Sequence, residues 1–285
     1  MAISKGHIVE YYDSCEIDYR WMWDLENSRS MHFGYWDSSV RSLSDALHRQ
    51  NETLARRAGI TPDDDVLDAG CGVGGSSLYL AREFGCSVAG ISISPAQINQ
   101  ANRYARDEGL SDRVRFVEQD FTRTNFPDGS FSVIWAVESV CHANEKADFL
   151  REAFRLLRPG GRLILADGFE AHPEYSHEET ALMQSWANGW AVNRLANARQ
   201  FEASARALGF ANTELRNITE NVFPSSRRLH RLASLSLLFG RMAELLRLRA
   251  QIQTQNIVAA RDQHLALRRG LWFYGVFYAE VPQAN

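Results

Sequence analysis

The sequence predicts an α/β protein with a doubly wound, mostly parallel seven-stranded sheet of the Rossmann-like kind, extended by helical N-terminal and lid insertions. The first observation is that short apolar segments alternate with amphipathic segments from Asp65 onward, as in a parallel sheet covered by helices on both faces. The second is a glycine-rich turn, GCGVGG, directly after the first apolar segment, where such folds place a ligand-binding loop. The composition, with 45% hydrophobic and 23% charged residues, is that of a globular chain and excludes fibrous and disordered classes.

The expected elements follow one another in the order that a doubly wound sheet requires. Strands are expected over 65–70, 87–93, 113–120, 131–139 and 161–169, and helices over 76–85, 95–108 and 146–157. Ser94 occupies the N-cap position of the second of these helices, which favours a start at Pro95. Beyond residue 170 we expect two helices over 177–209, a strand near 213–219, helical material over 229–267 and a last strand over 271–281.

We interpret the 285 residues as one domain built from four kinds of segment. These are a helical N-terminal cap (1–60), a cofactor-binding core (61–170), helical lid elements (171–210 and 222–269) and final strands (211–220 and 271–281). The chain begins without an apolar secretory segment, and its richest apolar run, 232–240, is too short to span a bilayer. These features favour a cytoplasmic protein. The four cysteines form no C-x-x-C pair, so neither a disulfide framework nor a metal site is expected.

The segment VLDAGCGVGG, residues 66–75, contains two overlapping ligand-binding motifs. The pattern G-x-G-x-x-G from Gly70 suits the pyrophosphate of a dinucleotide, because the turn and the helix after it expose backbone N–H groups. The pattern D-x-G-x-G from Asp68 suits S-adenosylmethionine, because a carboxylate there can meet an ammonium group, which NAD lacks. Asp120 ends the third expected strand and can accept a hydrogen bond from an adenine amine. The two carboxylates favour S-adenosylmethionine over NAD(P).

Together with LRPGGRLILAD, residues 157–167, and the bulky terminal strand, these motifs resemble the class I S-adenosylmethionine-dependent methyltransferases, over roughly 66–167. GISISPAQ, residues 90–97, and the segment 135–161 are most similar to the branch of tocopherol, sterol and cyclopropane-forming methyltransferases. The resemblance implies binding of S-adenosylmethionine, release of S-adenosylhomocysteine and no metal. It implies cofactor contacts by Asp68, Gly70, Gly72, Ser92, Gln97, Asp120, Phe121, Ala136 and Tyr12.

One of these contacts departs from the pattern of the wider family. An acidic residue usually ends the second strand and holds the ribose hydroxyls, whereas this sequence has Ser92 there. The branch carries a glutamine after its serine, and Gln97 is similar to it. The resemblance therefore implies ribose contacts by Ser92 and Gln97, and the alternative for Gln97 is a solvated helix residue.

Glu138, His142 and Tyr35 are the candidate catalytic residues. The fourth strand delivers AVESVCHA beside the sulfonium in related enzymes, and Glu138 there could remove a proton or stabilise a developing cation. The alternatives are a salt-bridged structural carboxylate at Glu138 and a loop-bonding role for His142. Aromatic and imidazole side chains of MHFGYWD and of the lid are candidates for the substrate pocket or, alternatively, for packing: His32, Phe33, Trp36, Trp186 and Trp190.

These features predict methyl transfer to a small, largely apolar metabolite, with carbon methylation of an unsaturated or electron-rich acceptor slightly favoured. Oxygen or nitrogen methylation of an aromatic natural product is the alternative within the class. An NAD(P)-dependent oxidoreductase and a non-catalytic cofactor-binding module are the alternatives outside it. A nucleic-acid substrate is not expected, because no RNA-recognition motif or basic N-terminal arm is present.

The segment 227–269 carries nine arginines against Glu244 and Asp262, in a chain of net charge −4. We interpret it first as a solvated face. The alternatives are contact with an anionic substrate group, or with a membrane surface through an apolar face that bears Leu235, Leu238, Met242 and Leu245. A homodimer is left open.

Overall fold

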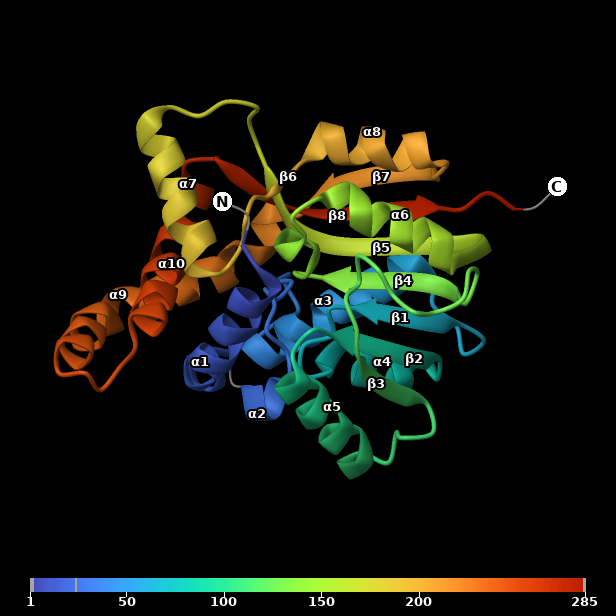
Figure 1. The fold of residues 1–285 in the computed structure, drawn as a ribbon, viewed down its shortest axis with the longest axis horizontal. Helices are drawn as coiled ribbons and strands as arrows, with labels where there is room; N and C mark the ends of the chain where they lie inside the picture. Colours follow the sequence, from blue (N-terminus) through green and yellow to red (C-terminus); the bar gives the residue numbers. More distant parts are fainter. Residues whose placement is uncertain (1–2, 24, 284–285) are drawn as a thin grey trace.

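The central sheet has the strand order β3-β2-β1-β4-β5-β8-β7 in a computed structural model that describes residues 3–23 and 25–283. The strands are β1 Asp65–Ala69, β2 Ser87–Ser92, β3 Val114–Glu118, β4 Phe131–Val137, β5 Leu157–Glu170, β6 Ala196–Asn197, β7 Ala211–Asn217 and β8 Trp272–Glu280. Strands β1 to β5 pair in parallel, β8 runs antiparallel between β5 and β7, and the two-residue β6 lies beside β5 (Figure 1). The mostly parallel, Rossmann-like sheet predicted from the sequence is confirmed.

The helices cover both faces of this sheet and one of its ends. They are α1 Lys5–Trp23, α2 Leu25–Ser28, α3 Leu43–Ala58, α4 Gly75–Phe84, α5 Pro95–Asp107, α6 Lys146–Leu156, α7 His177–Gly189, α8 Ala198–Leu208, α9 Thr219–Leu245 and α10 Gln251–Arg268, with a 3-10 turn η1 at Val140–His142. Figure 1 shows α1, α7, α9 and α10 gathered beyond one end of the strands.

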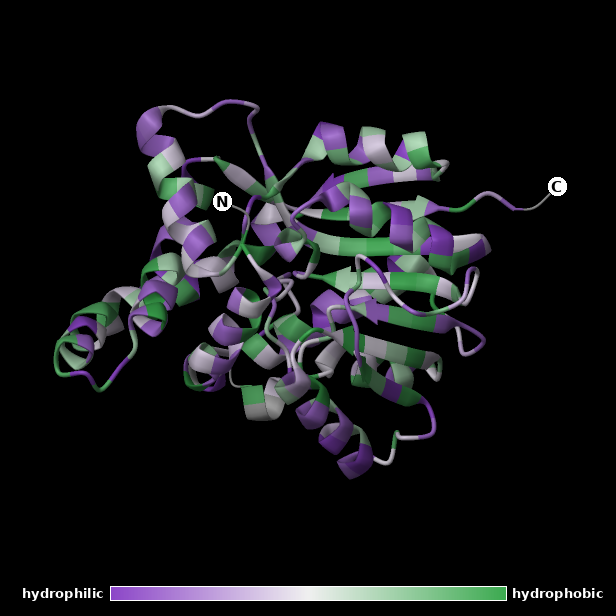
Figure 2. Ribbon diagram, viewed as in Figure 1, coloured by the Kyte–Doolittle hydropathy of each residue, from purple (hydrophilic) through white to green (hydrophobic). Residues whose placement is uncertain are grey.

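Successive side chains along the central strands belong to two different hydrophobic cores, one on each face of the sheet. Val66 and Val133 belong to a cluster completed by α3, α4 and α5, whereas the next residues, Leu67 and Ile134, belong to a cluster completed by α6 and α8. Successive side chains of a strand point to opposite faces, so a strand buried on both faces is largely apolar. Figure 2 shows this as hydrophobic colour along the central strands.

Two elements differ from the sequence-based expectation. Helix α9 begins at Thr219, ahead of the expected start near 229, and continues through Pro224. Its first turns are held by tertiary contacts, since Val222 and Ser225 are buried. Helix α8 packs against α6 and β7, so this part of the expected lid lies on the sheet. Within the described residues, no helix is long and apolar enough to cross a membrane.

Candidate active site

Two adjoining cavities lie beyond the carboxyl ends of the parallel strands. The first, which we name the glycine cavity, is lined by the turn after β1, the end of β2 and the segment after β4. The second, the aromatic cavity, is lined by rings from α1, α7, β8 and the loop before α3. Four side chains line both cavities: Tyr12, Met31, Glu138 and His142. A group passing from one cavity to the other moves among these four side chains.

The turn after β1 depends on its glycines. Gly70 and Gly72 have left-handed backbone, with φ of 93° and 53°, which side chains other than that of glycine rarely adopt. A Cβ on Gly70 would overlap Ser139, and one on Gly72 would lie 2.8 Å from Met31 Cε. The glycines therefore keep the floor of the glycine cavity open.

Asp68 is buried beneath this turn and lines the glycine cavity. Its carboxylate accepts a hydrogen bond of 2.6 Å from the Ser77 hydroxyl in the first turns of α4. Burial raises the pKa of Asp68 to about 7, although the Ser77 hydrogen bonds act in the opposite direction. A cationic ligand group beside Asp68 would favour its ionised form.

Ser92 and Gln97 meet at the end of β2, as a pair that lines the same cavity. The Ser92 hydroxyl donates to Gln97 Oε1 at 2.7 Å and accepts from the Ser94 N–H at 3.1 Å. Ser94 caps α5, whose predicted start at Pro95 is confirmed. The cap thereby brings a helix residue and a strand residue together.

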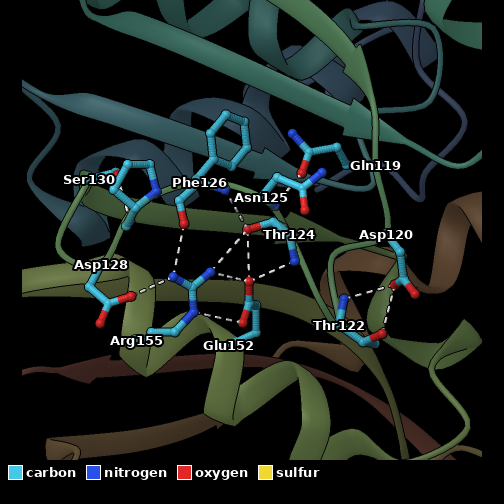
Figure 3. Close-up of polar contacts among 11 residues, drawn as sticks. Gln119, Asp120, Thr122, Thr124, Asn125, Phe126, Asp128, Ser130, Glu152 and Arg155 are labelled. Atoms are coloured by element: carbon cyan, nitrogen blue, oxygen red, sulfur yellow. Dashed lines mark hydrogen bonds and ion pairs between the residues drawn. The ribbon is translucent and has the colours of Figure 1, made fainter.

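Asp120 lies just beyond β3 and does not line the glycine cavity, whereas Phe121 does. One Asp120 oxygen accepts from the N–H and hydroxyl of Thr122, both at 2.8 Å (Figure 3), and the carboxylate pairs with Lys5. Burial acts to raise the pKa of Asp120, but these partners hold it below its usual range. Its expected contact with an adenine amine stays a prediction. Ala136 is buried within β4, and its neighbour Val137 lines the cavity.

Glu138 follows β4 with left-handed backbone, at φ 50°, a strained conformation for a residue with a side chain. Its Oε1 accepts hydrogen bonds from the Phe33 N–H at 2.6 Å and the Tyr274 hydroxyl at 2.8 Å. Burial raises the pKa of Glu138 to about 8, against the lowering effect of those hydrogen bonds. The structure therefore holds a strained, half-buried carboxyl group at the junction of the two cavities.

His142 lies on the other side of this junction. Its Nδ1 is 2.9 Å from the Ala191 carbonyl oxygen, and its Nε2 is 2.9 Å from the Tyr12 hydroxyl. A carbonyl oxygen can only accept, so Nδ1 carries the proton and Nε2 accepts from Tyr12. Burial lowers the pKa of His142 to about 4. His142 is thus a neutral imidazole with its basic nitrogen at the junction.

Rings around Phe33 form the wall of the aromatic cavity. The Phe33 ring centroid lies 5.9 Å from that of Trp23, 6.2 Å from Trp272 and 5.8 Å from Tyr274. Trp186 and Trp190 also line this cavity, with ring centroids 5.8 Å apart. The lining of this cavity is therefore largely aromatic, as is common in small-molecule sites.

Sequence reasoning missed several members of this wall, among them Trp23, Trp272 and Tyr274. A signal for two of them was present. Residues 272 and 274 alternate along the last strand, and because β8 is antiparallel to β5, its first residues lie at the ligand edge of the sheet. The polar side chains of Asp18 and Asn256, which also line the cavity, carry no comparable pattern.

The segment MHFGYWD is divided between different surroundings. His32 lines the glycine cavity and Phe33 the aromatic cavity, whereas Tyr35 and Trp36 line neither. Their N–H groups bond to backbone oxygens of Ala46 and Asn221 at 2.9 Å. His32 Nδ1 bonds to the Phe33 carbonyl at 2.8 Å, and its buried Nε2 has no partner among the described residues. His32 therefore offers an acceptor that a ligand can fill.

Comparison with known proteins identifies the class. Residues 67–165 match a methyltransferase domain family. The chain is 34% identical over 220 residues to "Methyltransferase GfsG" of Streptomyces halstedii, covering 76% of this chain and 77% of that protein. It is 33% identical over 196 residues to 27-O-demethylrifamycin SV methyltransferase of Amycolatopsis mediterranei, covering 69% and 72%. The chain belongs to the S-adenosylmethionine-dependent methyltransferases that act on small molecules.

Other relatives share a smaller part of their length. The chain is 37% identical over 198 residues to the tocopherol O-methyltransferase of Arabidopsis thaliana, of which it covers 54%. The structure also superimposes on that of the [4+2]-cyclase SpnF, with a TM-score of 0.79 and 22% identity, covering 100% of this chain and 98% of that one. It superimposes on a geranyl diphosphate C-methyltransferase of Streptomyces coelicolor with a TM-score of 0.74 and 21% identity, covering 97% of each chain. These two likenesses show the fold.

The class of protein settles which ligand the glycine motif binds: it is S-adenosylmethionine and not a dinucleotide. Among the described residues, no group of three or more His, Cys, Asp or Glu could hold a metal ion.

Proposed function

We propose that the protein methylates an unsaturated or electron-rich carbon of a small, largely apolar acceptor held in the aromatic cavity. The observation that carries the proposal is the position of Glu138, which lines both cavities and has one oxygen held by Phe33 and Tyr274. S-adenosylmethionine supplies an activated methyl group on a sulfonium and leaves as S-adenosylhomocysteine. Alignment and charge stabilisation are left to the protein.

The glycine cavity fits that cofactor. Gly70 and Gly72 keep space that a Cβ would fill, and Asp68 offers a carboxyl group to a cationic group. His32 Nε2, buried without a partner among the described residues, can accept from an ammonium, amine or hydroxyl. Ser92 and Gln97 offer hydroxyl and amide groups to the ribose. These residues would hold the cofactor.

Glu138 and the aromatic wall suit carbon methylation. An alkene or electron-rich ring gains positive charge when its carbon takes a methyl group, and a carboxylate or the faces of aromatic rings stabilise such charge. A cation formed near Glu138 would also favour its ionised form and oppose the effect of burial on its pKa. Glu138 could then accept the proton that leaves the methylated carbon.

Oxygen methylation is the second candidate, and the tautomer of His142 favours it. His142 is a neutral imidazole whose Nε2 accepts from the Tyr12 hydroxyl. An acceptor hydroxyl that displaces the Tyr12 hydroxyl could give its proton to this nitrogen. The names of the relatives support both reactions, since tocopherol O-methyltransferase and sterol 24-C-methyltransferase are both similar to this chain. Glu138 is therefore the candidate base for methylation of a carbon, and His142 is the candidate base for methylation of an oxygen.

The test uses S-adenosylmethionine with a deuterated methyl group and two acceptors of matched size, an isoprenoid alkene and a phenol. Nuclear magnetic resonance of the products tells a carbon-bound label from an oxygen-bound label. We expect label on carbon, lost in Glu138→Gln and retained in His142→Gln. Label on oxygen alone, at a rate that Glu138→Gln leaves unchanged, would overturn the proposal and favour the second candidate.

A further inference from the structure

The outer part of α9 has an apolar face that is largely exposed in the described chain. Its large side chains are spaced three or four residues apart, which places them on one side of the helix. They are highly exposed: Leu235 75%, Leu238 66%, Phe239 72%, Met242 54% and Leu245 84%. The opposite side is the one that packs, since Ala233 and Gly240 are buried and Leu237 contacts a small cluster with Ile257 of α10.

This apolar face is concentrated in one place. Together with Leu232 on α9 and with Leu246 and Leu248 in the turn before α10, these residues form what we name the α9 patch. Elsewhere in the described chain, the large hydrophobic residues counted as exposed are Ile17 and Val117. Figure 2 shows hydrophobic colour recurring along α9. A contiguous patch of this kind marks an interaction surface.

Exposed arginines accompany the patch. Arg227 and Arg231 precede the patch in the sequence, and Arg241 and Arg247 lie within its length; all four are exposed. Within the described residues, none of the four guanidinium groups has a hydrogen bond or ion pair. Between 227 and 250 the one acidic residue is Glu244. The segment 227–250 is therefore basic, although the whole chain has a net charge of −4.

We propose that the α9 patch docks on an anionic lipid surface, with α9 lying in the interface. Acyl chains accept the leucine and phenylalanine side chains, and lipid phosphates pair with the free arginines. A second copy of the chain fits less well, because two α9 patches in contact would bring their unpaired arginines together. Helix α9 also lies at the margin of the molecule (Figure 1). Its outer face can therefore meet a broad, flat partner such as a membrane more easily than a narrow groove.

Helix α9 and the helix that packs against it, α10, also form part of the aromatic cavity. Leu229 of α9 and Ala260 of α10 line that cavity, so docking of α9 would hold the cavity close to the lipid. An apolar acceptor dissolved in a membrane would then have a short path to the site. The docking itself does not depend on the identity of the acceptor or on methyl transfer.

The test is co-sedimentation of the full chain with sucrose-loaded vesicles. Vesicles of equal parts phosphatidylglycerol and phosphatidylcholine should sediment the protein at 50 mM NaCl, and raising the salt to 500 mM should weaken binding. Leu238→Ser, Phe239→Ser and Leu245→Ser together should weaken it by at least tenfold. Arg231→Gln and Arg241→Gln should each weaken it by roughly fivefold. Circular dichroism and thermal unfolding check that each variant folds.

Matched controls lie outside the patch. Ile17→Ser with Val117→Ser removes the exposed hydrophobic side chains elsewhere, and Arg151→Gln removes an exposed arginine of α6; vesicle binding should not change. Failure of the intact chain to sediment with anionic vesicles would overturn the proposal, as would equal loss in the control variants. A dimer in analytical ultracentrifugation that the serine substitutions dissociate, without vesicle binding by the intact chain, would reassign the patch to self-association.

Discussion

The Tyr274 hydroxyl donates a hydrogen bond of 2.8 Å to Glu138 Oε1 across 136 residues of sequence. β4, which ends just before Glu138, and β8, which carries Tyr274, are not adjacent, since β5 lies between them in the sheet. The contact therefore crosses the ligand edge of the sheet above β5. It ties the carboxyl group between the two cavities to the strand that forms one wall of the aromatic cavity.

Glu138→Gln should lower turnover by roughly 10²–10⁴ and leave cofactor affinity nearly unchanged. Glutamine retains an oxygen that can accept from Phe33 and Tyr274 but cannot become negatively charged. A charge needed only as the methyl group moves contributes to the transition state. Steady-state kinetics and calorimetry with S-adenosylhomocysteine measure the two effects. Near-normal turnover would contradict a catalytic role, and loss of cofactor binding would indicate a structural one.

The same substitution should raise stability at alkaline pH. Burial raises the pKa of Glu138 from 4.5 to about 8, so between these values the folded state binds a proton that the unfolded state has released. The free energy of unfolding therefore falls by a few kcal/mol as pH rises from 4.5 to 8. Urea unfolding should find Glu138→Gln more stable than the wild type at pH 8 and within about 1 kcal/mol of it at pH 5. Equal stability at pH 8 would mean that the carboxyl group is ionised at little cost.

Tyr274→Phe tests whether Tyr274 positions Glu138. Loss of this hydrogen bond, which lowers the pKa of Glu138, should raise that pKa by about one to two units. Turnover should fall by roughly tenfold at pH 7, and the rising limb of the pH–rate profile should move to higher pH. Added to Glu138→Gln, the substitution should have little further effect. A lower rate with an unmoved pH profile would mean that Tyr274 acts on the acceptor or on packing.

Cofactor affinity should depend on pH through Asp68. Burial raises the pKa of Asp68 to about 7, and a cationic group of the cofactor binds the ionised carboxylate. Affinity should therefore rise between pH 5.5 and 7, by up to tenfold per unit, and level off above pH 7. Asp68→Asn should bind roughly 10- to 100-fold more weakly and with little pH dependence. Asp65→Asn, an exposed change in the same strand, is the matched control; an equal loss there would exclude a specific role for Asp68.

Local patterns were enough for the core of the fold and for the floor of the glycine cavity. The alternation of apolar strands with helices, the glycines at positive φ and the cap at Ser94 are properties of a few consecutive residues. The positions of Asp68, Ser92 and Glu138 at strand ends follow from the same pattern, because the carboxyl ends of parallel strands share one edge of a sheet. The early start of α9 did not follow, because contacts far away in the sequence hold it.

By itself, the sequence determined the class of fold, the cofactor and the strand edge at which the ligand residues lie, because periodicity and turn chemistry are local. Tertiary structure decided which side chains meet at that edge. It brought Tyr274 to Glu138 and Ala191 to His142, divided His32 from Phe33 between two cavities and left Tyr35 outside both. Such contacts depend on strand order, on the antiparallel course of β8 and on the packing of α7 and α10 against each other. These are relationships between distant segments, which no local pattern of residues specifies.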